Sequence, residues 1–155
     1  MTNGTPIEQK VLVDTCFLIS LVNEKDSLHK NAEDYFRWLL SNATTLYMST
    51  ITLSEFQEKQ SELGILENFR LLPFGMEEVA AQHVKFPREI INGSSGDARV
   101  GVKDDIKILS TCFAKNIETI LSADSKLIIL ATSNGLRVID FKKPIQEHLA
   151  QLPLV

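Results

Sequence analysis

The sequence predicts an α/β fold, in which a mainly parallel sheet is covered by helices on both faces. Short apolar runs of strand length, such as KVLV (10–13) and TILSA (119–123), alternate along the chain with segments of helical period. The 155 residues are 44% hydrophobic, which is enough for one sizeable core. We therefore expect a single domain over residues 1–155.

The first half of the chain predicts two strands with helices between and after them. Beyond the strand at 10–13, TCFLISLV predicts a short helix that ends near Asn23. HKNAEDYFRWLL predicts a longer amphipathic helix, capped by Asp26 or Ser27. Its expected apolar face comprises Leu28, Ala32, Tyr35, Phe36, Leu39 and Leu40. TTLYMS (44–49) predicts the second strand, ITLSEFQEKQSEL a helix, and ILENFR a short helix.

The second half continues the same alternation. LLPF (71–74) predicts a third short strand that Pro73 ends, and MEEVAAQHVKF predicts a helix. DDIKILSTCFAKN and SKLIILATSNG predict two further helices, the second with Gly135 as its C-cap. RVIDF predicts the last strand, and the tail from Pro144 predicts a terminal helix.

Residues 92–101 contain several glycines and serines and predict a loop between two helices. Two interpretations of this loop stay open. It is either a lid that gates a substrate site or an insertion without a fixed structure.

Charge and composition exclude several classes of protein. A net charge of -4 argues against a protein that coats nucleic acid by bulk attraction, but not against a nuclease whose acids bind divalent cations. No apolar run approaches the roughly 20 residues that span a bilayer, and the N-terminus has no apolar signal region. Cys16 and Cys112 lie far apart in apolar segments, which indicates free buried thiols in a reducing compartment. We expect a cytoplasmic protein without a membrane partner.

Acidic residues stand at several predicted helix starts, and each has a local explanation. Asp14 and Asp124 follow strands and can cap the helices that come next. Glu55 fits a capping box with Thr52. One of the two acids that open DDIKILS fits the N-cap of that helix.

The order of these acids along the chain favours a shared role. In a parallel α/β sheet the carboxyl ends of the strands meet at one edge, and ligands bind where the strand order reverses. Carboxylates that converge there repel one another, and a hard cation such as Mg²⁺ or Mn²⁺ removes that repulsion. Asp14, Glu55, Asp105 or its neighbour Asp104, and Asp124 therefore predict a metal site.

Four segments carry a family resemblance. VLVDTCFLI, STITLSEF, KDDIKILSTCFA and TILSADSKLI resemble, in this order and spacing, the four motifs of PIN domains, and among these they look most like VapC-type toxins. The resemblance covers about residues 9–141 and leaves 142–155 as a C-terminal tail. It implies a PIN-like three-layer α/β/α sandwich whose five-stranded sheet has the order 3-2-1-4-5. That order reverses between the first and fourth strands, beside Asp14 and Asp124.

The resemblance also implies a function: a metal-dependent endoribonuclease, a hydrolase that leaves a 5′-phosphate and a 3′-hydroxyl. Asp14, Glu55, Asp105 and Asp124 match the family's four acids and are expected to ligate Mg²⁺ or Mn²⁺. Asp104 takes the place of a family asparagine. The implied partners are an RNA substrate, a cognate antitoxin protein and a second copy of the chain in a homodimer.

Several residues near the acids are candidates for contacts with the substrate. Arg99, Lys103 and Asp104 lie in or next to the predicted loop, and Ser122 matches the threonine of the family's Thr-x-Asp motif. Lys107 and Lys126 are further candidates for phosphate contacts, although ordinary surface charge explains them as well.

The sequence departs from the family at two places. Cys16 stands where relatives often have Asn or Ser, so a hydrogen bond near the first acid is missing or altered. Ser125, Lys126 and Leu127 follow Asp124, where many relatives have another acid. We expect the first metal site to be intact and leave the presence of a second open.

Other functions are weighed against the nuclease. A phosphatase of the haloacid-dehalogenase type needs a second acid at the position of Cys16, and a receiver domain needs paired acids where only Glu8 occurs. No GxxxxGK[ST] or GxGxxG loop is present. The alternative that stays open is a catalytically weak PIN fold that acts as an RNA- or protein-binding module.

Overall fold

The computed structural model describes residues 9–59, 64–72, 75, 77–78, 81 and 97–150. For residues 58–59, 65 and 97–104 it describes the backbone alone. All statements below concern these residues.

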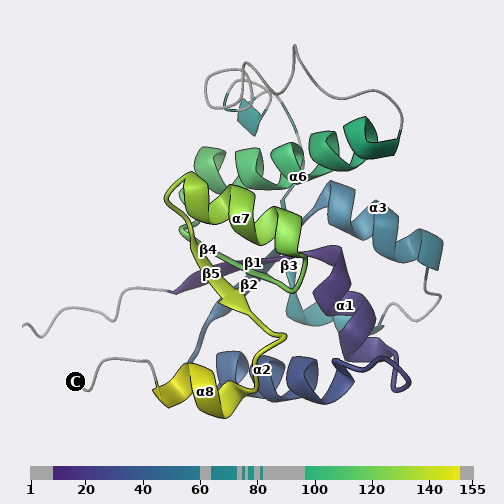
Figure 1. Ribbon diagram of the computed structural model, residues 1–155, viewed down its shortest axis with the longest axis vertical. Coiled ribbons are helices and arrows are strands. Elements are labelled where there is room, and N and C mark those ends of the chain that lie inside the picture. The colour runs from purple at the N-terminus through teal and green to yellow at the C-terminus, as the bar shows by residue number, and fades with distance from the viewer. Residues whose placement is uncertain are drawn as a thin grey trace, which may run out of the picture.

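The described chain forms one five-stranded sheet in which all neighbouring strands are parallel (Figure 1). The strands are β1 (Lys10–Val13), β2 (Thr45–Ser49), β3 (Arg70–Leu72), β4 (Thr119–Ser122) and β5 (Arg137–Asp140). Their order is β3-β2-β1-β4-β5, as predicted. β1 therefore lies between β2 and β4, and the order reverses between β1 and β4. This reversal is where an α/β sheet offers a ligand site.

Helices cover both faces of the sheet, which confirms the predicted three-layer sandwich (Figure 1). On one face lie α1 (Thr15–Val22), α2 (His29–Ser41) and α8 (Ile145–Ala150), and on the other lie α6 (Asp97–Ala114) and α7 (Ser125–Ser133). β1 shows why both faces are apolar: Val11 and Val13 pack in the first core, and Leu12 packs in the second. Successive side chains of a strand point to opposite faces, so a strand buried on both sides is apolar throughout.

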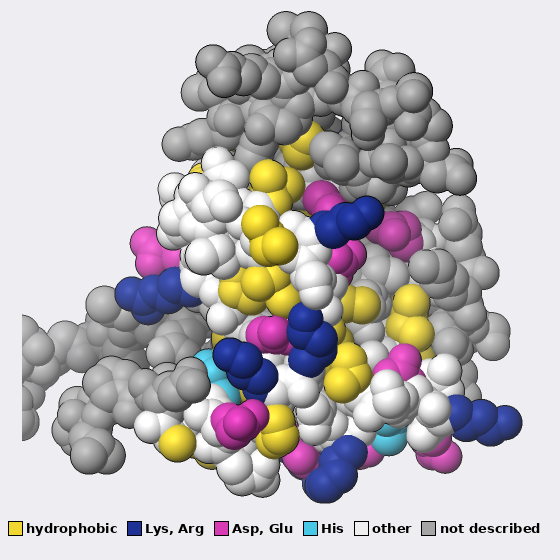
Figure 2. Space-filling view, viewed as in Figure 1, with side chains coloured by type: hydrophobic (Ala, Val, Ile, Leu, Met, Phe, Trp, Pro, Cys, Tyr) yellow, Lys and Arg dark blue, Asp and Glu magenta, His cyan; other side chains and the backbone are white. Residues whose placement is uncertain are grey.

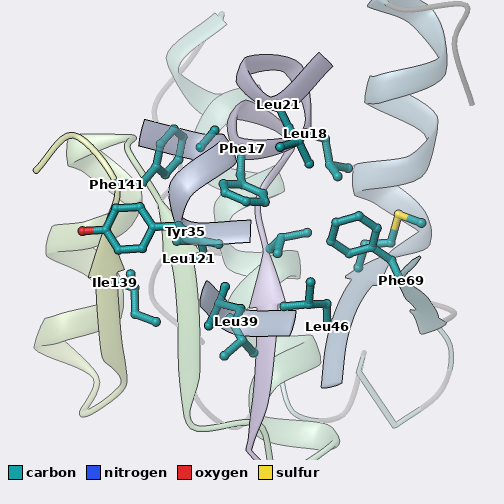
Figure 3. Packing of buried hydrophobic residues seen from close by; sticks show 14 of the residues in the cluster. Phe17, Leu18, Leu21, Tyr35, Leu39, Leu46, Phe69, Leu121, Ile139 and Phe141 are labelled. Atoms are coloured by element: carbon teal, nitrogen blue, oxygen red, sulfur yellow. The ribbon is translucent and has the colours of Figure 1, made fainter. Parts of the chain in front are cut away.

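The first core combines aromatic and aliphatic side chains and is shown in Figure 3. Phe17 from α1 is fully buried and meets Phe141 edge to face, with 5.2 Å between the ring centroids. Tyr35 from α2 is buried as well, and its hydroxyl donates a hydrogen bond to the carbonyl of Lys143 at 3.0 Å. These contacts tie α1 and α2 to the chain that leaves β5, and so fix α1 against the sheet.

α3 (Thr50–Lys59) packs against α1, α6 and β2. The predicted capping box of Thr52 and Glu55 is wrong, because the helix begins earlier than expected. The Ser49 hydroxyl accepts a hydrogen bond from the Thr52 backbone N–H at 3.1 Å and takes the capping role. Glu55 then lies beyond the first turn, where it has no part in a capping box.

The helix α6 begins at Asp97, seven residues before the predicted start at Asp104. Residues 97–101 are therefore helical instead of part of a loop, and 92–96 lie outside the described residues. Asp104 and Asp105 consequently stand inside the helix, and neither is its N-cap. One glycine inside a helix costs only about 1 kcal/mol, which a long helix with a buried face tolerates.

The remaining elements follow the sequence closely, except that the N-cap of α2 is Leu28 instead of the predicted Asp26 or Ser27. A 3₁₀ helix, η1 (Gly64–Asn68), takes the place of the short helix expected at ILENFR. Helix α7 ends at Ser133 with Asn134 as its C-cap in place of the predicted Gly135, which follows with a positive φ of 83°. Leu40 is an exception on α2, because it is 43% exposed and not part of the core face. Most of MEEVAAQHVKF lies outside the described residues.

Cys16 and Cys112 are free thiols, as predicted, with Cys112 buried and Cys16 half-buried. No helix in the described ranges combines the length and the apolar composition needed to cross a bilayer.

Replacing Phe17 by alanine is expected to lower the free energy of unfolding by about 3–5 kcal/mol, because the ring is fully buried and its loss leaves a cavity. Ile129→Ala is the matched control: this side chain is 67% exposed, and the change is expected to stay within about 0.5 kcal/mol. Urea unfolding of both variants measures the difference. Equal losses would contradict this assignment of the core.

Candidate active site

Asp14 stands directly after β1, at the edge of the sheet where the strand order reverses. Its backbone N–H donates to the carbonyl of Leu121 at 3.1 Å, which continues the pairing of β1 with β4. Its side chain is only 7% exposed, and Oδ1 accepts a hydrogen bond from the Thr15 N–H at 2.7 Å. The predicted role as N-cap of α1 is thereby confirmed.

The second oxygen of this carboxylate is held by two side chains. The Ser122 hydroxyl donates to Oδ2 of Asp14 at 3.0 Å, and the Cys16 thiol donates to the same oxygen at 3.3 Å. Ser122 ends β4, the strand next to β1, and is fully buried. Its oxygen also accepts a hydrogen bond from the Asp124 backbone N–H at 3.0 Å. One hydroxyl therefore joins the two acids that flank the reversal of strand order.

Burial raises the pKa of Asp14, and this effect outweighs the hydrogen bonds from Cys16, Ser122 and Thr15, which lower it. The negative charge of Asp124 raises the pKa of Asp14 further. A carboxylate in this position is costly to ionise in the absence of a positive partner. An acid whose charged form is destabilised, in a ligand-binding region, is a typical feature of functional sites.

Asp124 stands two residues after the end of β4, whereas Asp14 directly follows β1. It is exposed, and its Oδ1 accepts hydrogen bonds from the N–H groups of Lys126 at 2.9 Å and Leu127 at 3.4 Å. The predicted role as N-cap of α7 is confirmed. Both acids thus have the local role that explains them singly, and they also interact with each other.

Cys16 is the site residue whose role sequence reasoning left undecided. Burial and the charge of Asp14 raise the pKa of its thiol to about 12, so the group stays protonated and can donate. The Ala123 N–H donates to its sulfur at 3.5 Å. The hydrogen bond to the first acid, which the sequence left as missing or altered, is present and comes from sulfur. In the sequence, the feature that pointed to this contact is the position of Cys16 two residues after Asp14.

Glu55 and Asp105 lie on α3 and α6, two helices that pack against each other. Both side chains are half-buried, and both take part in interactions within the chain. Among the described residues, however, no three His, Cys, Asp or Glu side chains form a group that could hold a metal ion. The structure therefore brings Asp14 and Asp124 into interaction, without joining Glu55 or Asp105 to them in one ligand cluster.

The donors at Asp14 and Asp124 nevertheless suit a hard divalent cation. Mg²⁺ is commonly held by one or two carboxylates and completes its shell with water and phosphate oxygens. Oδ2 of Asp124 accepts no hydrogen bond within the described chain, so it is available as a ligand. The Thr15 hydroxyl next to Asp14 is buried and likewise lacks a hydrogen-bond partner there, which a bound water or ion commonly explains.

The basic candidates are only partly visible. Arg99, Lys103 and Asp104 lie on the described backbone of α6, but their side chains are outside the description. Lys126 is exposed beside Asp124, and Lys107 is half-buried and engaged within the chain. On the face seen in Figure 2, Lys and Arg side chains lie next to Asp and Glu side chains and form no single basic patch.

The two histidines that the structure describes, His29 and His148, give no support to a zinc site. His29 contacts Glu33 at 2.6 Å and the Ser20 carbonyl at 2.9 Å, and His148 packs edge to face on Trp38.

A groove of about 940 Å³, lined by Lys10, Trp38 and Arg137 among others, lies where β1, β4 and β5 begin. It is thus at the opposite edge of the sheet from Asp14.

No protein-family model and no curated protein sequence matches the chain. Solved structures do match it. VapBC2 from Rickettsia felis, bound to a DNA fragment from its promoter, is 18% identical with a TM-score of 0.61 over 85% of this chain and 98% of that one. FitAcB from Neisseria gonorrhoeae gives the same values. VapC20 from Mycobacterium tuberculosis, a toxin that cleaves the sarcin–ricin loop, is 15% identical with a TM-score of 0.52 over 77% of this chain and 94% of that one.

These likenesses extend over nearly the whole length of the matched chains. Identities of 15–18% establish a common fold, because strand order and layer arrangement persist when sequences have diverged this far. The resemblance to PIN domains is confirmed at this level. The chain has the parallel five-stranded α/β/α fold of the PIN domains of VapC- and FitB-type proteins.

Proposed function

We propose that this chain is a metal-dependent endoribonuclease that hydrolyses RNA phosphodiester bonds. The observation that carries the proposal is the carboxylate of Asp14, which is buried, repelled by Asp124 and placed beside the reversal of strand order. Both acids cap helices, but capping leaves the burial of Asp14 and its repulsion by Asp124 without compensation. A divalent cation accounts for the pair, since it offsets both the burial and the repulsion.

Asp14 and Asp124 would hold Mg²⁺ or Mn²⁺, and we propose that Asp105 and Glu55 complete the site from α6 and α3, directly or through water. When bound, the cation lowers the pKa of a coordinated water and stabilises negative charge on the scissile phosphate. The chain's own contribution is to fix the two acids at adjacent strand ends and to satisfy their other oxygens with donors.

RNA supplies a chain of phosphates, which the net charge of -4 would repel in the absence of a cation. Lys126 is exposed and follows Asp124 by two residues, so its side chain is a candidate contact for a phosphate that flanks the scissile bond. Lys107, Lys103 and Arg99 are further candidates on α6. VapC20, whose fold this chain shares, acts on an RNA element, and this supports RNA as the substrate class.

We further propose that the chain is the toxin of a toxin–antitoxin pair, that it binds a cognate antitoxin protein and that it forms a homodimer. VapBC2 and FitAcB, which share its fold, are toxin–antitoxin proteins, and this supports an antitoxin partner. The cytoplasm is the compartment that suits a ribonuclease with two free thiols.

The alternative is a PIN fold that binds RNA or protein and cuts nothing. The absence of a three-acid cluster among the described residues favours it. The buried, destabilised Asp14 opposes it, because a binding module has no use for a carboxylate that is costly to ionise. Cleavage assays on metal-loaded protein distinguish the two.

Asp14→Asn is expected to lower the rate of RNA cleavage by at least about 100-fold, because loss of metal assistance costs several kcal/mol and each 1.4 kcal/mol is tenfold. Asp34→Asn on α2 is the matched control, since within the described part of the chain Asp34 is engaged only in a surface ion pair with Lys30. Cleavage of a labelled RNA by purified variants measures both. Equal rates for Asp14→Asn and wild type would remove the support for this site.

Treatment with EDTA is expected to abolish cleavage, and added Mg²⁺ or Mn²⁺ to restore it. Either cation should also raise the melting temperature of the wild-type protein, because a ligand that binds only the folded state stabilises it. Asp14→Asn should show a much smaller increase. Thermal melts with and without Mn²⁺ test this, and cleavage that persists in EDTA would contradict metal dependence.

The stability of the metal-free protein is expected to depend on Asp14 with a defined sign. The raised pKa means that the folded state holds the Asp14 proton more tightly than the unfolded chain does. Stability therefore falls as pH rises from the ordinary Asp value of about 4 through the raised value. Asp14→Asn, which keeps a good helix-capping residue, should be more stable than wild type at pH 7.

Urea unfolding in EDTA at pH 7 and pH 3 measures this effect, and the advantage of Asp14→Asn should disappear at the lower pH. Asp34→Asn should show no such advantage. A variant that is less stable than wild type at neutral pH would show that Asp14 is held as a favourable ion.

A further inference from the structure

The two oxygens of the Asp14 carboxylate are used unequally. Oδ2 accepts from Ser122 and from Cys16, whereas the single donor to Oδ1 among the described residues is the Thr15 backbone N–H. A carboxylate oxygen has about two lone-pair directions. Both are therefore occupied at Oδ2, and one is left at Oδ1.

The Cys16 thiol is itself fixed from the other side of the site. Its sulfur accepts from the Ala123 N–H at 3.5 Å and lies 3.6 Å from the Ser122 hydroxyl. Ala123 belongs to the turn between β4 and α7, which also carries Asp124. The thiol thus links the first turn of α1 to the turn that presents the second acid.

The two oxygens of the Asp124 carboxylate also accept unequal numbers of hydrogen bonds. Its Oδ1 accepts two backbone hydrogen bonds from the first turn of α7, and its Oδ2 accepts none within the described chain. Each acid therefore keeps one oxygen available, Oδ1 of Asp14 and Oδ2 of Asp124. The protein fixes the other oxygens with donors that belong to neighbouring turns.

We infer that Cys16 and Ser122 are positioning residues that saturate Oδ2 of Asp14 and so present Oδ1 alone to the cation. This inference rests on the proposed function, because it concerns the same metal site. It assigns the Cys16 thiol the hydrogen-bonding role that an Asn or Ser side chain would otherwise have at this position. Groups that orient metal ligands typically change metal affinity by about 10–100-fold when removed.

The test is Mn²⁺ binding to the full-length, metal-free protein, measured by electron paramagnetic resonance of the free ion without RNA. Cys16→Ala is expected to weaken Mn²⁺ binding by about tenfold, the lower end of the usual range, because a thiol is a weak donor. Cys16→Ser should restore most of the affinity, since a hydroxyl can donate to the same oxygen. RNA cleavage should show the same order at limiting Mn²⁺ and a smaller difference at saturating Mn²⁺.

Cys112→Ala is the matched control. Cys112 is a fully buried thiol on α6 that packs in the second core. Its replacement should lower the melting temperature and leave Mn²⁺ affinity unchanged. Ser122→Ala should weaken binding more than Cys16→Ala, because Asp14 and the Asp124 N–H both lose a partner. If Ser122→Ala does not fold, Cys16→Ala and Cys16→Ser still test whether Cys16 positions the Asp14 carboxylate.

The outcomes separate this inference from the proposed function. If wild type binds Mn²⁺ and cleaves RNA, but Cys16→Ala binds Mn²⁺ as tightly as wild type, the positioning role is overturned and the nuclease stands. If Cys16→Ala and Cys112→Ala lower Mn²⁺ affinity alike, Cys16 is only structural and the inference is overturned. If wild type neither binds Mn²⁺ nor loses cleavage in EDTA, the proposed function fails and the inference fails with it.

Discussion

The buried negative charge of Asp14 at the end of β1 is the constraint on which the rest of the site depends. Water solvates a carboxylate well, and this one is only 7% exposed and is repelled by a second acid. The protein offsets part of that cost with three hydrogen-bond donors, from Thr15, Cys16 and Ser122. The cost that is left shows in the raised pKa of the group. Acids that are destabilised in this way are frequent at functional sites, where stability is given up for chemistry.

Strand order determines which residues surround this charge. Because β1 pairs with both β2 and β4, the turn after β4 lies beside the turn after β1, although Ser122 and Asp14 are 108 residues apart in sequence. Helices α1 and α7 both begin here, each with an aspartate as N-cap. The N-terminus of a helix favours negative charge, so both helix dipoles stabilise the pair. The two rings that pack between α1 and β5, Phe17 and Phe141, hold the first of these helices in place.

The likeness to VapC and FitB proteins concerns the fold, and a fold of this kind does not by itself decide the chemistry. What supports a nuclease is the site. Asp14 and Asp124 interact across adjacent strands, whereas Glu55 and Asp105 lie on two helices that pack together, without forming a cluster of three acids in the described chain. A divalent cation offsets repulsion between acids, so metal binding is the decisive measurement.

The sequence by itself determined the strands, most of the helices and the capping roles of Asp14 and Asp124, because apolar period and cap chemistry are local signals. Local signals failed at α6, where residues 97–101 were predicted to be loop but are helical, and at α3, where Ser49 and not Thr52 is the capping residue. Only the tertiary structure decided that Cys16 donates to Asp14 and that a buried hydroxyl joins the two acids. Those contacts depend on the pairing of β1 with β4, and pairing between distant strands is set by the packing of the whole sheet.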